Sequence, residues 1–200
     1  MSIIDNKMPE IQVIAGPNGS GKSTITQLID LNVIYVNADD IKKTAMCSDM
    51  EAAKIAEKMR NMLVSQHEDF CFETVMSTDR NINLLIKAKE EGYFIKSFYV
   101  VTVSPEINIE RVKTRVSQGG HDVPNEKIIS RYYKSINLIK QVVSLSDICH
   151  IYDNSGNDLY RIFKKRKTQC FYDECEFWDY NDISKMTAVD NMEKTDLNIV

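Results

Sequence analysis

One segment near the N-terminus constrains this chain more than any other feature. It reads Gly16-Pro17-Asn18-Gly19-Ser20-Gly21-Lys22-Ser23-Thr24 and fits the phosphate-binding loop pattern of Gly, four residues, Gly-Lys and then Ser or Thr. A chance match in a chain of 200 residues has a probability on the order of one per cent. The segment also lies between an apolar run and a helical pattern, which is where such a loop has to be.

The residue types in this segment suit the binding of a nucleoside triphosphate. Its glycines let successive backbone N–H groups point at one phosphate, and the start of the following helix adds positive potential. Lys22 would reach the β- and γ-phosphates, and the hydroxyl of Ser23 would hold Mg²⁺. We therefore expect Gly16 to Thr24 to bind a nucleoside triphosphate and magnesium.

Short apolar runs alternate with helical patterns along the rest of the chain. The apolar and β-branched runs predict strands, and the 3- and 4-residue spacing of apolar side chains predicts helices. The expected strands lie at 11–15, 33–37, 70–74, 93–104 and 148–152, and the expected helices at 23–31, 50–66, 80–91, 105–118 and 124–143. This alternation indicates an α/β fold with a parallel sheet of about five strands and helices on both faces, and the phosphate-binding loop after the first strand makes it a fold of the P-loop NTPase type.

We expect residues 1–183 to form a single domain, with its core in residues 11–156, followed by a loose acidic tail at 184–200. The segment 161–167 holds five basic residues and 173–182 holds five acidic ones. The favoured interpretation is an exposed strand or hairpin whose arms complement each other. The alternative is a small nucleic-acid or phosphate-binding patch.

Charge and composition exclude several classes of protein. With 25 basic and 29 acidic residues the net charge is −4, which argues against a protein that coats nucleic acid. No apolar run approaches the ~20 residues that span a bilayer, and the first seven residues lack the pattern of a signal peptide. The five cysteines include no Cys-x-x-Cys pair. We therefore expect a cytoplasmic protein with no membrane partner.

Acidic side chains follow two of the predicted strands. Asp39 and Asp40 come after the second strand, and Glu73 lies at the end of the third. The carboxyl ends of parallel strands share one edge with the phosphate-binding loop, so these carboxylates should meet there. A carboxylate near the γ-phosphate can accept the proton of an attacking hydroxyl, as a small kinase requires. An ABC-type ATPase is excluded, because the nearest sequence to its Leu-Ser-Gly-Gly-Gln signature is Ser-Gln-Gly-Gly-His at 117–121.

Arginines on the next two predicted helices could neutralise the phosphates. Arg111 and Arg115 are four residues apart and so project from one helix face, and Arg131 lies on the following helix. The connection Gly119-Gly120-His121-Asp122-Val123-Pro124 would let the two helices close as a lid over the phosphates. The planar guanidinium group pairs with phosphate oxygens through two hydrogen bonds.

These segments together resemble the zeta-toxin family of P-loop kinases, in its free-standing branch with the Gly-Gly-His-x-Val-Pro motif. The resemblance extends from about residue 11 to 156, and rests on the following segments: 16–24, Asn37-Ala38-Asp39, Phe72-Glu73-Thr74, Arg111-Val112, Arg115-Val116, 119–124, Arg131-Tyr132 and Asp153-Asn154-Ser155-Gly156. It implies that Asp39 is the catalytic base, that Glu73, Thr74 and His121 bind substrate, and that Arg111 contacts the phosphates. The second lid arginine of the family falls near His121, so Arg115 or Arg131 would substitute for it.

The resemblance also implies an activity. Zeta toxins phosphorylate UDP-N-acetylglucosamine on the 3′-hydroxyl of its sugar, and a separately encoded antitoxin would be the protein partner. We expect a phosphotransferase that moves the γ-phosphoryl group of ATP to a hydroxyl of a small substrate such as a nucleotide sugar. The alternatives are a kinase of another metabolite or of a nucleotide end, and a non-catalytic NTP-binding switch module.

Overall fold

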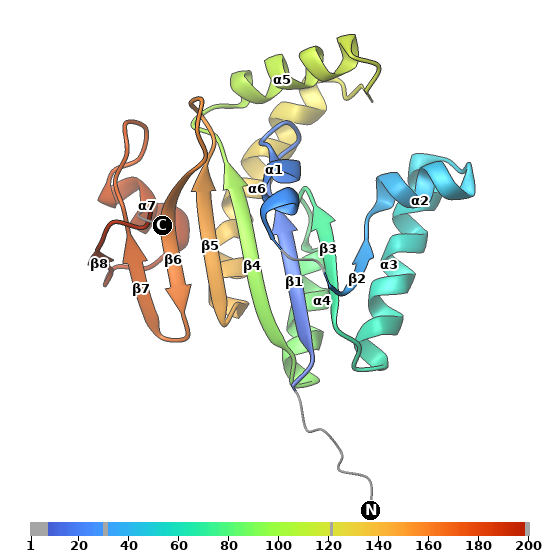
Figure 1. Cartoon of the computed structure of the whole chain (residues 1–200), viewed down its shortest axis with the longest axis horizontal. Helices are drawn as coiled ribbons and strands as arrows, with labels where there is room; N and C mark the ends of the chain where they lie inside the picture. The colour runs from blue at the N-terminus through green and yellow to red at the C-terminus, as the bar shows by residue number, and fades with distance from the viewer. Residues whose placement is uncertain (1–7, 30–31, 121, 199–200) are drawn as a thin grey trace, which may run out of the picture.

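The computed structural model describes residues 8–29, 32–120 and 122–198, which form one sheet with helices against both faces (Figure 1). The sheet has eight strands in the order β2-β3-β1-β4-β5-β6-β7-β8. The strands are β1 Glu10–Ala15, β2 Ile34–Val36, β3 Phe70–Thr74, β4 Phe94–Val101, β5 Ile148–Asp153, β6 Tyr160–Arg166, β7 Gln169–Tyr172 and β8 Glu193–Lys194. The helices are α1 Lys22–Leu28, α2 Ala38–Ala45, α3 Asp49–Ser65, α4 Asp79–Glu90, α5 Pro105–Ser117, α6 Asn125–Leu145 and α7 Tyr180–Thr187.

The first five strands of the sheet order run parallel, which confirms the α/β prediction. β1 pairs with β3 on one side and with β4 on the other, β2 pairs with β3, and β5 pairs with β4. At the carboxyl edge Ala15 of β1 is in register with Thr74 of β3. Polar residues that follow these strands therefore come out at one edge of the sheet, next to the phosphate-binding loop.

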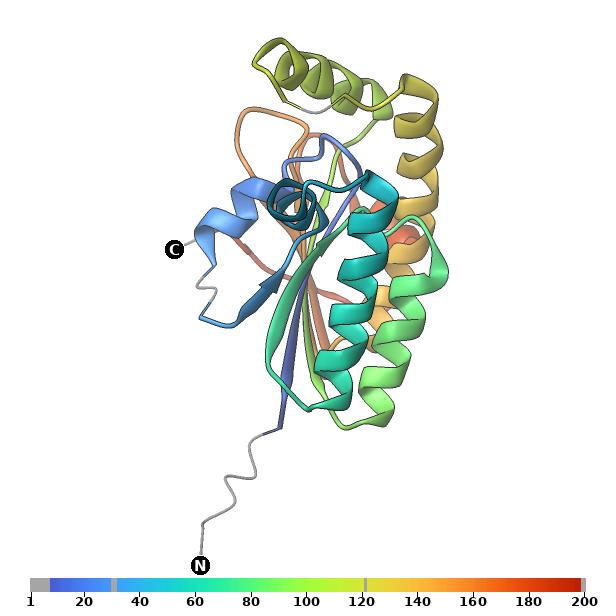
Figure 2. The ribbon, with the colours of Figure 1, turned by 90° about the vertical axis from the view of Figure 1, so that its right-hand side faces the viewer.

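Helices cover the two faces of the sheet unequally. Figure 2 shows α1 on one face and α3, α4 and α6 on the other. Alternation along β1 divides the apolar side chains accordingly: Val13 belongs to the main core under α3, α4 and α6, whereas Ile14 packs with Ile25 of α1. The prediction of helices on both faces is confirmed.

The sheet is wider than the expected five strands because the chain continues past β5. β6 and β7 form an antiparallel hairpin, and β8 adds to β7 in parallel. A hairpin is therefore present, with the basic segment as its first arm. The expectation that the acidic segment 173–182 forms the complementary arm is wrong, because the second arm is β7 and Glu174 pairs with Lys194 of β8.

The expectation of a loose tail at 184–200 is wrong for residues 184–198. α7 begins at a reciprocal cap between Asp179 and Asp182, and it packs against α6. Further on, Leu197 is buried and its backbone N–H donates to Asp173 at 3.0 Å. Asn198 exchanges two hydrogen bonds with the backbone of Arg161, at 2.7 and 3.1 Å. Polar contacts to β6 and β7 thus fix a segment whose composition alone suggests disorder.

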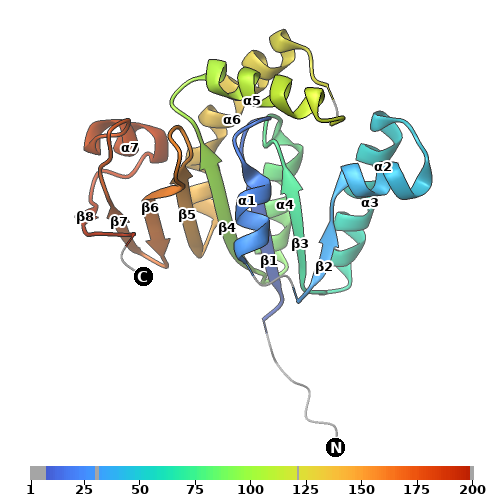
Figure 3. The same ribbon diagram turned by 45° about the horizontal axis from the view of Figure 1, so that its top comes forward.

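Above the carboxyl edge of the sheet, α5 and the start of α6 stand apart from the main core (Figure 3). They share a small apolar cluster of their own, formed by Val112, Val123 and Ile128 with Ile109 and Val116 at its border. A separate cluster lets this helix pair keep its own packing, as the predicted lid requires. Within the part of the chain that the structure describes, no helix is both long and apolar enough to cross a membrane.

Candidate active site

The phosphate-binding loop runs from Gly16, after β1, to Lys22, the first residue of α1. Gly19 and Gly21 have φ of 78° and 97°, in the left-handed region that glycine adopts without steric cost. A Cβ at Gly19 would lie 2.5 Å from the carbonyl oxygen of Asn108, and one at Gly21 would lie 2.1 Å from Nδ2 of Asn154. The loop is thus held between α5 and the segment that follows β5, and both positions require glycine.

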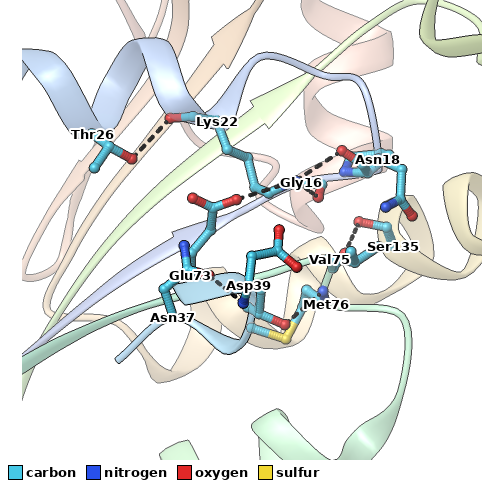
Figure 4. Close-up of polar contacts among 12 residues, drawn as sticks. Gly16, Asn18, Lys22, Thr26, Asn37, Asp39, Glu73, Val75, Met76 and Ser135 are labelled. Carbon is cyan, nitrogen blue, oxygen red and sulfur yellow. Dashed lines mark hydrogen bonds and ion pairs between the residues drawn. The ribbon is translucent and has the colours of Figure 1, made fainter. Parts of the chain in front are cut away.

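Lys22 is buried under this loop. Its Nζ donates to the carbonyl oxygens of Gly16 at 3.0 Å and Pro17 at 3.1 Å, and lies 3.8 Å from Oε1 of Glu73 (Figure 4). Burial lowers the pKa of the Lys22 ammonium, and Glu73 is the main group that opposes this shift. The ammonium is therefore aimed at the inside of the loop, where phosphates would lie, and a carboxylate steadies it there.

A cleft of about 400 Å³ opens beside the loop at the carboxyl edge of the sheet. Its lining includes eight of the predicted site residues: Asn18, Gly19, Lys22, Asp39, Glu73, Thr74, Arg115 and Arg131. Strand ends, the loop and the helix pair above the sheet therefore do meet, as the order of the strands predicts. Among the predicted carboxylates and arginines, Asp40 and Arg111 are not part of this lining.

Hydrogen bonds connect the two acidic candidates. The Tyr35 hydroxyl donates to Oε2 of Glu73 at 3.2 Å, and Nδ2 of Asn37 donates to the Tyr35 oxygen at 3.1 Å. The Asn37 side chain also caps α2 by accepting the backbone N–H of Asp39 at 2.8 Å. Burial raises the pKa of Tyr35 to about 12, so its hydroxyl keeps the proton that it donates. The network orients Glu73 and places Asp39 in the first turn of α2, with its carboxylate exposed to the cleft (Figure 4).

The wall after β3 is fixed by side-chain hydrogen bonds. The Thr74 hydroxyl oxygen accepts the backbone N–H of Met76 at 3.0 Å and Nδ2 of Asn81 at 2.7 Å. From α6, the Ser135 hydroxyl donates to the carbonyl of Val75 at 2.8 Å. Thr74 therefore lines the cleft on a segment held by α4 and α6.

The three predicted arginines lie in different surroundings. Arg131 lines the cleft, with Nη1 3.4 Å from Oδ1 of Asn18 in the loop, and Arg115 lines the same cleft from α5. Nη2 of Arg111 instead donates to the carbonyl of Gly156 at 3.4 Å, and burial lowers its pKa while Asp153 opposes that shift. The structure thus brings two of the three to the cleft and places Arg111 against the segment after β5.

His121, the other candidate of this region, lies outside the described residues. Ser23 and Thr24 are exposed in the first turn of α1, next to the loop. Within the described ranges, no group of three or more His, Cys, Asp or Glu side chains could hold a metal ion. The hydroxyl of Ser23, next to the loop, is a ligand of the kind that magnesium takes together with the phosphate oxygens of a nucleotide.

The sequence analysis missed two cations that line the cleft, Arg60 of α3 and Arg80 of α4. A signal for Arg60 was present, because it stands four and eight residues after Ala56 and Ala52, which are buried. An arginine on the apolar face of a helix has to extend its charged group to a polar partner or to solvent, which marks it as a candidate for a site. For Arg80, the second residue of α4, the sequence holds no comparable signal.

Comparison with known proteins identifies the family to which the chain belongs. The model of the family described as zeta toxin matches residues 2–165. An uncharacterized protein of Haemophilus influenzae is 31% identical over 123 residues, which cover 58% of this chain and 88% of that protein.

Solved structures share the fold at low sequence identity. A crystal structure of AvrRxo1-ORF1:-ORF2 with ATP has a TM-score of 0.69 and 14% identity, and the match covers 92% of this chain and 64% of that one. The PezAT chromosomal toxin–antitoxin system of Streptococcus pneumoniae has a TM-score of 0.56 and 15% identity, covering 80% of this chain and 72% of that one. This chain thus spans just under two thirds of the AvrRxo1 chain that it matches.

Proposed function

The chain belongs to the zeta toxin family, and from that premise we propose that it transfers the γ-phosphoryl group of ATP to a hydroxyl of a small acceptor. The observation that carries the proposal is the cleft shared by Lys22, Asp39 and Glu73 beside the phosphate-binding loop. It provides a cation for the phosphates and two carboxylates for the acceptor within one cleft. A module that only binds an NTP as a switch would not need the two carboxylates.

Each residue of the cleft has a step to perform. Asp39 accepts the proton of the attacking hydroxyl as its oxygen bonds to the γ-phosphorus, while the bond to the bridging oxygen of ADP breaks. Glu73, held by Tyr35, accepts a hydrogen bond from the acceptor and orients it. Lys22, Arg115 and Arg131 stabilise the charge on the transferring group. Magnesium, with Ser23 as its protein ligand, would neutralise the β- and γ-phosphates.

Arg111 takes a different part in this proposal. Phosphate contact by Arg111 requires its guanidinium to leave the carbonyl of Gly156. Because α5 already contacts the phosphate-binding loop at Gly19, a change in the conformation of the long arginine side chain would be enough to reach the phosphates. The small apolar cluster that α5 shares with the start of α6 would stay intact.

We propose UDP-N-acetylglucosamine as the first acceptor to test and an antitoxin as the protein partner. Both follow from the resemblance to zeta toxins, and the match to a toxin–antitoxin system supports the second. A nucleotide end as acceptor has no comparable support, since the basic residues of β6 do not line the cleft. Lys165 of that strand instead donates to the carbonyl of Val143 in α6 at 2.6 Å.

Mass analysis tests the proposal directly. The protein is incubated with γ-labelled ATP, Mg²⁺ and UDP-N-acetylglucosamine, and the expected product is one phosphate heavier than the acceptor. Lys22→Ala should abolish this product, because the variant loses the cation aimed at the phosphates. ATP binding without any product, from this acceptor or from cell-extract metabolites, would favour the switch module instead.

A further inference from the structure

The cleft has a second group of cations, on the wall away from the phosphate-binding loop. Lys22, Arg115 and Arg131 come from α1, α5 and α6, whereas Arg60 and Arg80 come from α3 and α4. In the first group, Lys22 and Arg131 contact the phosphate-binding loop. The second group comes from the two helices on the other side of the cleft, so it could face a different part of the reacting pair.

Arg60 has an environment that calls for an anion. Its guanidinium lies over the ring of Phe72, with Cζ 5.1 Å from the ring centroid, which fixes the plane of the group. Its Nε is buried, and among the described residues it has no hydrogen-bond partner. Burial lowers the pKa of Arg60, and the carboxylate of Glu57 on the same helix opposes that shift. A buried N–H donor without a partner is costly unless an acceptor arrives to pair with it.

The fixed charges near this wall do not cancel. Oε2 of Glu57 lies 3.7 Å from Nη1 of Arg80, so one carboxylate stands beside two guanidinium groups. The next acid of the lining, Asp49, is engaged with Lys42 at 2.6 Å. An excess of positive charge therefore remains on the α3–α4 side of the cleft.

We propose that Arg60 and Arg80 bind a phosphate group that the acceptor already carries, and so select phosphorylated acceptors over uncharged ones. This inference rests on the proposed function and adds the residues that determine specificity. The planar fork of each guanidinium offers two parallel donors to phosphate oxygens, which a lysine does not. The hydroxyl to be phosphorylated then lies between this anchor and Asp39.

Binding of inorganic pyrophosphate tests the anchor without any need for catalysis. The loop is first filled with a non-hydrolysable ATP analogue and Mg²⁺, and pyrophosphate is then titrated by calorimetry. Arg60→Gln and Arg80→Gln should each weaken pyrophosphate binding at least about tenfold, since each removes charge-assisted hydrogen bonds. Arg166→Gln, an exposed position at the end of β6, should change it less than twofold. Arg80 is itself exposed, so loss of folding would not explain its effect.

Acceptor kinetics separate a failure of this inference from a failure of the proposed function. If UDP-N-acetylglucosamine is phosphorylated, Arg80→Gln should raise its KM about tenfold or more with little change in kcat, and free N-acetylglucosamine should be a poor acceptor for both proteins. Unchanged KM values, or unchanged pyrophosphate affinity in both variants, would overturn the anchor while the kinase activity stands. Pyrophosphate binding that depends on both arginines in a protein without kinase activity would support the anchor alone.

Discussion

The side-chain amide of Asn154 donates a hydrogen bond of 2.7 Å to the backbone carbonyl of Ser20, in the middle of the phosphate-binding loop. The backbone N–H of Asn154 in turn donates to the carbonyl of Val101 at the end of β4, at 2.9 Å. A residue from the end of β5 thus fixes a loop formed some 130 residues earlier. The loop has its shape before a nucleotide binds, and preorganisation of this kind increases affinity.

Asn154→Ala should therefore weaken ATP binding. The Ser20 carbonyl would lose the partner that holds the loop in its binding shape, which costs about 1–3 kcal/mol and corresponds to a rise of roughly 5- to 150-fold in the Kd for ATP. Titration calorimetry with ATP and Mg²⁺ measures the change. Asn157→Ala, at an exposed position three residues on, is the matched control and should bind ATP as the wild type does. Equal affinity in the two variants would contradict a supporting role for Asn154.

Gly21 is expected to tolerate no side chain. Alanine at this position would combine an unfavourable φ of 97° with a clash against Asn154, so Gly21→Ala should weaken ATP binding by more than about tenfold. Gly92 has a similar φ of 81°, but nothing lies within 4 Å of its would-be Cβ. Gly92→Ala should therefore cost only about 1 kcal/mol of stability and leave ATP affinity unchanged. Chemical unfolding of both variants measures the cost of the strained backbone. Nucleotide titration then shows the added effect of the clash with Asn154, which only Gly21→Ala should have.

The residues at the carboxyl edge of the sheet could be predicted from the sequence because each is recognised from its immediate neighbours in the chain. Each of Gly16, Asp39 and Glu73 follows or ends a short apolar strand, and parallel strands bring such ends together whatever their order. The short helix α2 was missed although its cap was visible, since Asn37 also reads as the end of a strand. At the C-terminus the acidic segment 173–182, which was expected in a strand or hairpin, instead supplies the cap of α7, Asp179 and Asp182.

Contacts between distant segments explain what the sequence left out. Arg111 and Arg115 share a helix face by spacing, yet the length of the arginine side chain lets one bond Gly156 while the other lines the cleft. The environment of Arg60 depends on Phe72, which lies on a different element. Spacing along a helix predicts which side chains project from the same face. Where their charged groups lie depends on the partners that other elements offer.

His150 makes the stability of the fold depend on pH. Its ring is stacked between Phe98, at a centroid distance of 5.6 Å, and Tyr152, at 6.2 Å. Burial, together with three nearby cations, lowers the pKa of His150 to about 4. The unfolded chain takes up a proton here below its usual pKa of 6.5, whereas the folded chain does so only near 4. The contribution of His150 to the free energy of unfolding is therefore fully present above pH 6.5. It is lost as the pH falls toward 4, which lowers the free energy of unfolding by up to about 3 kcal/mol.

His150→Phe should flatten this dependence while it keeps the ring stack. Urea unfolding at pH 7 and pH 4.5 measures the difference in free energy for wild type and variant. His67→Asn is the control, because His67 is exposed and has a φ of 55° that asparagine adopts readily. A loss of stability between the two pH values that is as large in His150→Phe as in the wild type would show that other groups cause it.

Two adjacent aspartates allow the proposed catalytic base to be tested almost without structural change. Asp39 lines the cleft at the first turn of α2, whereas its neighbour Asp40 is exposed and lies outside the lining. Asp39→Asn removes the proton acceptor but keeps the size of the side chain, so kcat should fall about 10²- to 10⁴-fold with ATP affinity nearly unchanged. Asp40→Asn makes the same change of charge at the same helix end, and its kcat should stay within about twofold of wild type. If both variants lose activity equally, the carboxylates act through the charge of the α2 N-terminus, and proton transfer has to be assigned to another group of the cleft.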